Sequence, residues 1–124
     1  MPNVRSNSSR GRGRPSRSEV LGRELTEAEA VYVSFVKVAT LREHTLIMSQ
    51  VELQSIWGEI ESQFSASEVD KGIATALIRR YADVERSVAV ASDLFNEAEK
   101  SRLVAYQAME QKRAEFTNHL IASA

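Results

Sequence analysis

Six arginines near the N-terminus are the side chains in this chain best suited to bind a ligand. They are Arg5, Arg10, Arg12, Arg14, Arg17 and Arg23. A single acid, Glu19, accompanies them, so residues 1–23 carry a net charge of +5, whereas residues 24–124 carry −6. Guanidinium groups stay charged at physiological pH and donate paired hydrogen bonds to phosphate oxygens. This charge distribution predicts that the N-terminal segment binds a polyanion.

The rest of the chain shows no arrangement of side chains typical of an enzyme. His44 and His119 are the only histidines, and neither has a second histidine or a set of acids at metal-ligand spacing. Cysteine is absent, which excludes disulfides and thiolate metal sites. Gly11-Arg12-Gly13 is not a dinucleotide fingerprint, because no strand precedes it. We therefore expect a non-enzymatic protein with no metal, no cofactor and no small-molecule substrate.

Residues 1–24 are predicted to form a flexible basic arm, followed by a helical oligomerisation domain over residues 25–124. Both prolines lie in the arm, as do Gly11 and Gly13, and the arm has no apolar face. No apolar run of signal-peptide or membrane-spanning length follows the arginines. Together with the lack of cysteine, this favours a protein that acts inside the cell or within a virion. An organelle transit peptide is a weaker alternative, because glycine and proline disfavour an amphipathic helix.

The first helix is predicted over residues 26–63. Thr26 can cap its start, and Glu27 and Glu29 then lie in the first turn, where the helix dipole favours acids. Apolar residues recur at alternating spacings of four and three, which places them on one helix face. They are Ala28, Tyr32, Phe35, Ala39, Leu46, Leu53, Ile56, Ile60 and Phe64. A second set is predicted to widen this face, namely Val31, Val38, Leu41, Val51 and Trp57.

A turn is predicted at residues 65–70, where the helical pattern is interrupted. Ser65 with Glu68, or Ser67 with Asp70, has the spacing of a capping box at the start of the next helix. Trp57 lies about two turns before this point. We expect it in the core at the end of the hairpin, with an interface anchor as the alternative.

The second helix is predicted over residues 68–122, because residues 73–124 contain neither glycine nor proline. Its apolar stripe consists of Val69, Ile73, Leu77, Tyr81, Val84, Val88, Ala91, Phe95, Ala98, Ala105, Met109, Phe116 and Leu120. The stripe weakens near Arg102. A bend, a stutter in the repeat or a break near Lys100–Ser101 would each explain this.

These elements define an all-α protein, either a long helical hairpin or a small helical bundle with coiled-coil character. At about 1.5 Å per residue the helices would measure roughly 57 Å and 80 Å. Rods of this length cannot bury their stripes in a compact monomer. Either the second helix breaks and folds back, or the stripe pairs with another subunit. We expect a homo-oligomer.

The four residues Arg12-Gly13-Arg14-Pro15 resemble the core of an AT-hook, a short DNA-binding motif. The resemblance covers these residues and their basic flanks. It implies that Arg12 and Arg14 point into the minor groove of A·T-rich DNA, while Gly13 lets the backbone lie against the groove floor. A narrow A·T groove attracts inserted arginine. Glycine has no Cβ to hold the chain away, and Pro15 favours an extended residue before it.

The sequence thus predicts an oligomeric nucleic-acid-binding protein, with DNA preferred over RNA. The expected contacts are Arg5, Arg10, Arg12, Arg14 and Arg17. Several arms on one assembly would strengthen binding that is weak and salt-dependent for one arm alone. Architectural DNA proteins, viral packaging subunits and helical capsid proteins share this design. The alternative is a structural or adaptor protein whose coiled coil binds a partner protein and whose basic tail is incidental.

Overall fold

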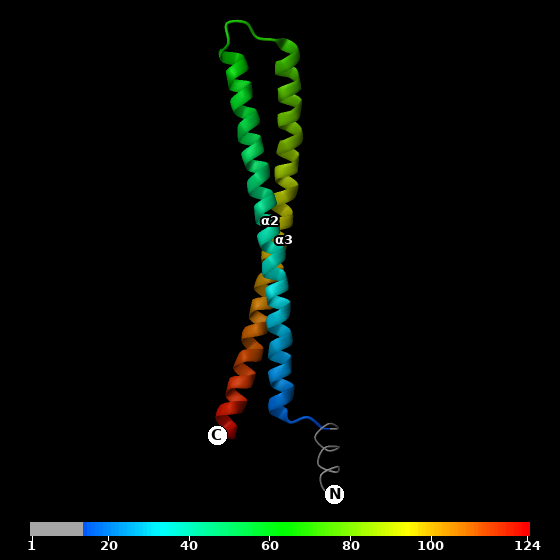
Figure 1. Cartoon of the computed structure of the whole chain (residues 1–124), viewed down its shortest axis with the longest axis vertical. Helices are drawn as coiled ribbons and strands as arrows, with labels where there is room; N and C mark the ends of the chain where they lie inside the picture. The colour runs from blue at the N-terminus through cyan, green and yellow to red at the C-terminus, as the bar shows by residue number, and fades with distance from the viewer. Residues whose placement is uncertain (1–13) are drawn as a thin grey trace, which may run out of the picture. The chain divides into compact units, whose positions relative to one another are not determined.

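The computed structural model describes residues 14–124, which form two helices joined by a short turn (Figure 1). Helix α2 spans Arg17–Ser65 and helix α3 spans Lys71–Ser123. No strand occurs between residues 14 and 124. The expected all-α helical hairpin is confirmed.

Helix α2 begins at Arg17, well before the predicted start near Leu25–Thr26. Ser16 caps it, because its Oγ accepts the backbone N–H of Glu19 at 3.1 Å. Thr26, the predicted cap, lies inside the helix and donates its hydroxyl to the carbonyl of Gly22 at 3.0 Å. The helical part of the chain therefore includes residues 17–24, which the charge pattern had assigned to the basic arm.

Helix α3 begins at Lys71, and neither predicted capping box forms. Asp70 is itself the cap: its Oδ1 accepts the backbone N–H groups of Gly72 at 2.9 Å and Ile73 at 3.1 Å. A carboxylate at this position satisfies two amides that have no partner within the helix and interacts favourably with the helix dipole. The helix then continues without a break to Ser123, past Lys100–Ser101.

Replacing Asp70 with alanine should lower the free energy of unfolding by about 1 kcal/mol, because two amides lose their acceptor. Asp70→Asn should retain most of the stability. Urea unfolding followed by circular dichroism at 222 nm measures both. Glu68→Ala is the control, since Glu68 is exposed in the same turn and should change stability by less than about 0.5 kcal/mol. An equal loss in D70A and E68A would contradict the assigned cap.

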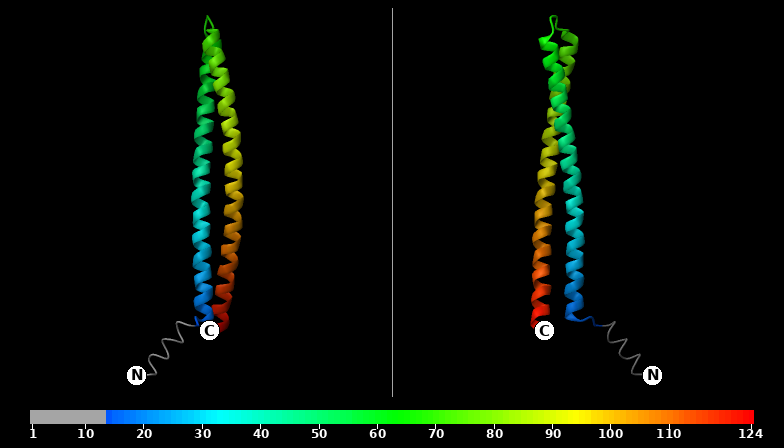
Figure 2. Two further views of the ribbon diagram at one scale, coloured as in Figure 1. Left: turned by 90° about the vertical axis from the view of Figure 1, so that its right-hand side faces the viewer. Right: turned by 60° about the vertical axis from the view of Figure 1, so that its left-hand side comes forward.

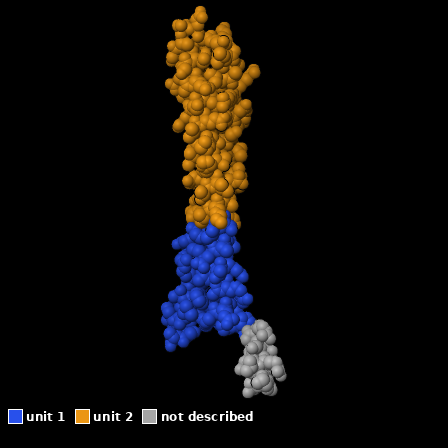
Figure 3. Space-filling model, viewed as in Figure 1, with its two compact units in different colours: residues 1–34, 103–124 blue, residues 35–102 orange. Residues whose placement is uncertain are grey.

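The chain divides into two compact units (Figure 3). Unit 2 comprises residues 35–102 and contains the turn. Within it the second part of α2 and the first part of α3 lie side by side in every view (Figure 2). Its core is formed by Ile56, Ile60 and Val84. The partly buried residues packed against them are Leu53, Leu77, Tyr81 and Val88.

Unit 1 comprises residues 1–34 and 103–124, of which the structure describes residues 14–34 and 103–124. Leu21, Ala105 and Met109 are buried in it. The rings of Tyr32 and Tyr106 pack with their centroids 5.5 Å apart. A Cβ built on Gly22 would lie 3.7 Å from Phe116, an ordinary contact distance. Gly22 therefore belongs to the helix packing and does not interrupt α2.

The predicted widening of the apolar face is wrong. All five residues of the second set are more than 40% exposed, Trp57 and Leu41 among them. Several residues assigned to the main stripes are exposed as well, namely Phe64, Val69, Ile73 and Leu120. In a hairpin each helix has one neighbour, so only a narrow seam of each helix is covered.

Candidate nucleic-acid interface

Arg14 and Arg17 flank the start of α2, and both are exposed. The Pro15-Ser16 pair separates them, and the Ser16 cap defines where the helical backbone begins. Neither side chain forms a hydrogen bond or an ion pair with any residue between 14 and 124. Three further arginines predicted to contact nucleic acid lie outside the described residues, namely Arg5, Arg10 and Arg12.

Basic residues on α3 of the same unit are instead paired with acids. Lys112 Nζ lies 3.4 Å from Glu24 Oε1 and 3.6 Å from Glu115 Oε2. Arg113 forms ion pairs with Glu29 and Glu110. Arg23, like Arg14 and Arg17, is exposed and has no such partner in the described part of the chain. Uncompensated positive charge in the described part of unit 1 is therefore found along the first turns of α2.

Some of the charged residues of unit 2 form pairs along and between its helices. Arg102 Nη2 donates to Glu99 Oε2 at 2.9 Å, and this hydrogen bond holds the pKa of the carboxyl below its usual range. Arg80 Nη2 lies 3.4 Å from Glu52 Oε1 on α2. Exposed pairs of this kind contribute little to stability. They do, however, neutralise part of the positive charge of unit 2.

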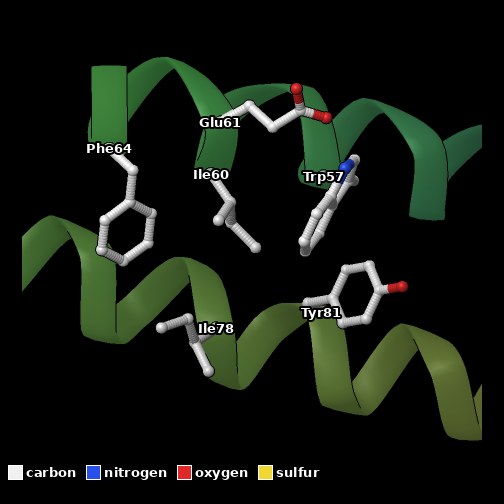
Figure 4. Close-up of a pocket in the computed structure, with 6 residues that line it drawn as sticks. All are labelled: Trp57, Ile60, Glu61, Phe64, Ile78 and Tyr81. Carbon is white, nitrogen blue, oxygen red and sulfur yellow. The ribbon is translucent and has the colours of Figure 1, made fainter. Parts of the chain in front are cut away.

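An apolar pocket lies near the turn of unit 2 (Figure 4). Its volume is about 380 Å³, and its lining consists of Trp57, Ile60, Glu61, Phe64, Ile78 and Tyr81. Trp57 and Phe64 extend from α2 toward α3 and are 50% and 59% exposed. The rings of Trp57 and Tyr81 are 5.7 Å apart at a tilt of 55°. The predicted core position of Trp57 is therefore corrected: it stands at the surface, beside a pocket suited to apolar contact.

The two histidines lie in different surroundings. His119 Nε2 is 3.0 Å from Ser18 Oγ in unit 1, whereas His44 is exposed on α2 in unit 2. Within residues 14–124, no group of three or more His, Asp or Glu side chains is arranged to hold a metal ion. Neither α2 nor α3 has a segment apolar enough to cross a membrane.

The apolar and charge patterns of the sequence did not predict two features of the described chain. The first is the Ser16 cap, whose signal is the capping-box spacing of Ser16 and Glu19. The second is a group of exposed apolar residues on α2, namely Leu41, Ile47, Met48 and Val51. Its signal is the run of residues 44–51, which contains no Asp, Glu, Lys or Arg. Both sequence features span only a few residues, whereas the predictions were based on the longer charge and apolar patterns.

No protein-family model matches the chain, and neither a curated protein nor a solved structure is detectably similar to it.

Proposed function

We propose that this chain binds nucleic acid, with a preference for DNA, through the arginines that precede and open α2. The observation that carries the proposal is the contrast within unit 1. Arg14 and Arg17 are exposed and unpaired among the described residues, whereas Lys112 and Arg113 are paired with acids. Arginines without an internal acid partner remain available to phosphate oxygens.

The residues before α2 and the residues from α2 onward carry opposite net charges. Residues 1–16 hold four arginines and no acid, a net charge of +4. Residues 17–124 hold twelve Lys or Arg against seventeen Asp or Glu, a net charge of −5. A negatively charged helical body is repelled by phosphate, so the N-terminal segment is the part that can approach a nucleic acid.

The position of the helix start also indicates which arginines can enter the minor groove and which can contact the phosphate backbone. The minor groove of B-DNA is about 6 Å wide and is too narrow for an α-helix. Arg12 and Arg14 precede Ser16 and resemble the groove-inserted arginines of an AT-hook, so we assign the A·T groove to them. Arg17 is the first residue of α2, and we assign it to the phosphate backbone, with Arg5 and Arg10 on the other flank.

Assembly through the helices would present several such segments together. One segment with few phosphate contacts binds weakly, and linked copies gain affinity through their effective concentration. An architectural DNA protein, a viral packaging subunit and a helical capsid protein all fit this design.

The test compares the full chain with a chain that begins at Ser16, which keeps the cap of α2. Fluorescence anisotropy with A·T-rich duplex, G·C-rich duplex and single-stranded RNA, each at two salt concentrations, measures binding. We expect the shortened chain to lose on the order of 100-fold in affinity, and the full chain to bind A·T-rich duplex best. Equal binding by both chains would refute the proposal. Shortening to residue 24 would confound the test, because Leu21 is 2% exposed and belongs to the core.

The pocket near the turn supports a second candidate, an adaptor that binds a partner protein. Exposed aromatic side chains beside an apolar cavity are typical of the central residues of protein interfaces. Trp57 and Phe64 meet this description. Failure of both the full and the shortened chain to bind any of the three nucleic acids would favour this function.

A further inference from the structure

Helix α2 carries apolar side chains on the side opposite its buried seam. Leu41, Ile47, Met48 and Val51, here called the outer stripe, are 67%, 47%, 54% and 54% exposed. At about 100° per residue they fall within a sector of roughly 120° centred opposite Ala39, Ile56 and Ile60. Those three face the core and are at most 6% exposed. This part of α2 is therefore apolar on both sides.

A helix that is apolar on all sides is typical of the interior of a larger assembly. Unit 2 supplies one neighbouring helix, and the outer stripe has no cover among the described residues. Residues 44–51 contain no Asp, Glu, Lys or Arg, so a second helix can approach them without burying one of these charged side chains. Residues 1–16 are a poor candidate for this cover, because Met1 and Val4 are their only large apolar residues.

We propose that the outer stripe is the contact surface for a second copy of this chain, with the two α2 helices packed antiparallel. The proposal deepens the assembly part of the proposed function and rests on it.

Charge determines the orientation of the second copy. Lys37 precedes the outer stripe along α2 and Glu61 follows it, and neither has an ion-pair partner in the described part of the chain. If Ile47 of each copy faces Met48 of the other, Lys37 comes opposite Gly58 and within about one turn of Glu61. Parallel packing would instead place Lys37 against Lys37, which is unfavourable.

Gly58 supports the same register. It lies in the interior of α2, where glycine disfavours the helix, and a Cβ built on it would meet no atom within 4 Å. Nothing within the hairpin therefore requires a glycine at this position. In the antiparallel pair its missing side chain leaves room for the aliphatic stem of Lys37 from the second copy.

The first test is the mass in solution of the full chain without nucleic acid, by sedimentation equilibrium over a concentration series. We expect a dimer, and we expect Ile47→Lys with Met48→Lys to raise the dissociation constant on the order of 100-fold. The matched controls are Val90→Lys, which alters an apolar residue of α3 that is 59% exposed, and Trp57→Lys at the pocket. Both should stay dimeric. A monomeric wild type, or dissociation only of a control variant, overturns the proposal.

If the double lysine variant fails to fold, exchanging two charges provides a second test of the antiparallel dimer. Lys37→Glu should weaken the dimer, and adding Glu61→Lys should restore it. The two residues lie roughly 36 Å apart along one helix, so restoration can arise only between copies. A lack of restoration overturns the antiparallel register. Nucleic-acid binding is measured separately on the wild-type chain and on the same variants. A wild-type chain that is monomeric but binds duplex would refute only the outer stripe as a dimer contact. A wild-type chain that is dimeric but binds no nucleic acid would refute only the proposed function.

Discussion

Replacing Arg5, Arg10, Arg12 and Arg14 with serine is expected to remove most of the salt dependence of DNA binding. Each phosphate neutralised on B-DNA contributes about −0.9 to the slope of log K against log salt concentration. Five arginine contacts predict a slope of about −4.5, or roughly a 500-fold loss of affinity between 50 and 200 mM salt. With Arg17 remaining, the slope should fall to about −1. Anisotropy titrations with an A·T-rich duplex at four salt concentrations measure it.

Two matched variants separate charge from groove recognition. Arg12→Lys with Arg14→Lys keeps the charge, so the salt slope should stay near −4.5 while the preference for A·T over G·C duplex is lost. The reason is that the narrow groove favours the weakly hydrated guanidinium over a strongly hydrated ammonium. Arg42→Ser with Arg79→Ser removes two exposed arginines of unit 2 and should leave the slope unchanged. If the salt slope instead becomes shallower when Arg42 and Arg79 are replaced, the binding surface lies on unit 2.

Replacing Ile56 with alanine is expected to lower the free energy of unfolding by about 2–5 kcal/mol. Ile56 is 1% exposed and packs with Ile60 and Val84, so the truncation removes buried methyl groups and leaves a cavity. Native domains are stable by only about 5–15 kcal/mol, so a loss of this size is a large share of the total. Urea unfolding of the full chain, followed at 222 nm, measures the change.

The size of the side chain and its burial can be tested separately at this core. Ile56→Val removes one methylene and should cost about 0.5–1.5 kcal/mol. Val90→Ala truncates an exposed residue of α3 and should change stability by less than about 0.5 kcal/mol. If I56A and V90A were equally stable, the core assigned to unit 2 would be wrong.

The seam of the hairpin was predictable from the sequence. The alternating four-and-three spacing places Ala39, Ile56 and Ile60 on one face of α2, and the structure buries all three. The same spacing predicted the burial of Val84 and Ala91 on α3. Periodicity succeeds here because it depends only on helix geometry, and residues 73–124 contain no glycine or proline to disturb that geometry.

The ends of the helices were harder to predict. Ser16, Thr26, Ser67 and Asp70 all have side chains that can cap a helix, and the last three lie near a predicted boundary. Asp70 was assigned as the acid of a capping box, whereas its carboxylate is the cap itself. Several local hydrogen-bonding schemes of similar energy compete at a helix end, and the packing of the neighbouring helix selects one.

At the candidate site, the sequence alone determined the separation of charge and the run of arginines. It did not reveal that α2 begins at Arg17, which limits groove insertion to the residues before Ser16. That boundary is stabilised by the burial of Leu21, where Gly22 leaves room beside Phe116, more than ninety residues away in the chain.

The sequence by itself determined two helices, the turn between them, the residues of the buried seam and the opposite charges of the N-terminal segment and the rest of the chain. These follow from local geometry and composition. Only the tertiary structure decided which apolar residues stay in water. Periodicity assigns Leu41, Val51 and Trp57 an angle around α2, but the number of neighbouring helices determines how wide a sector is covered. With α3 as the one neighbour in the described chain, these three side chains remain exposed.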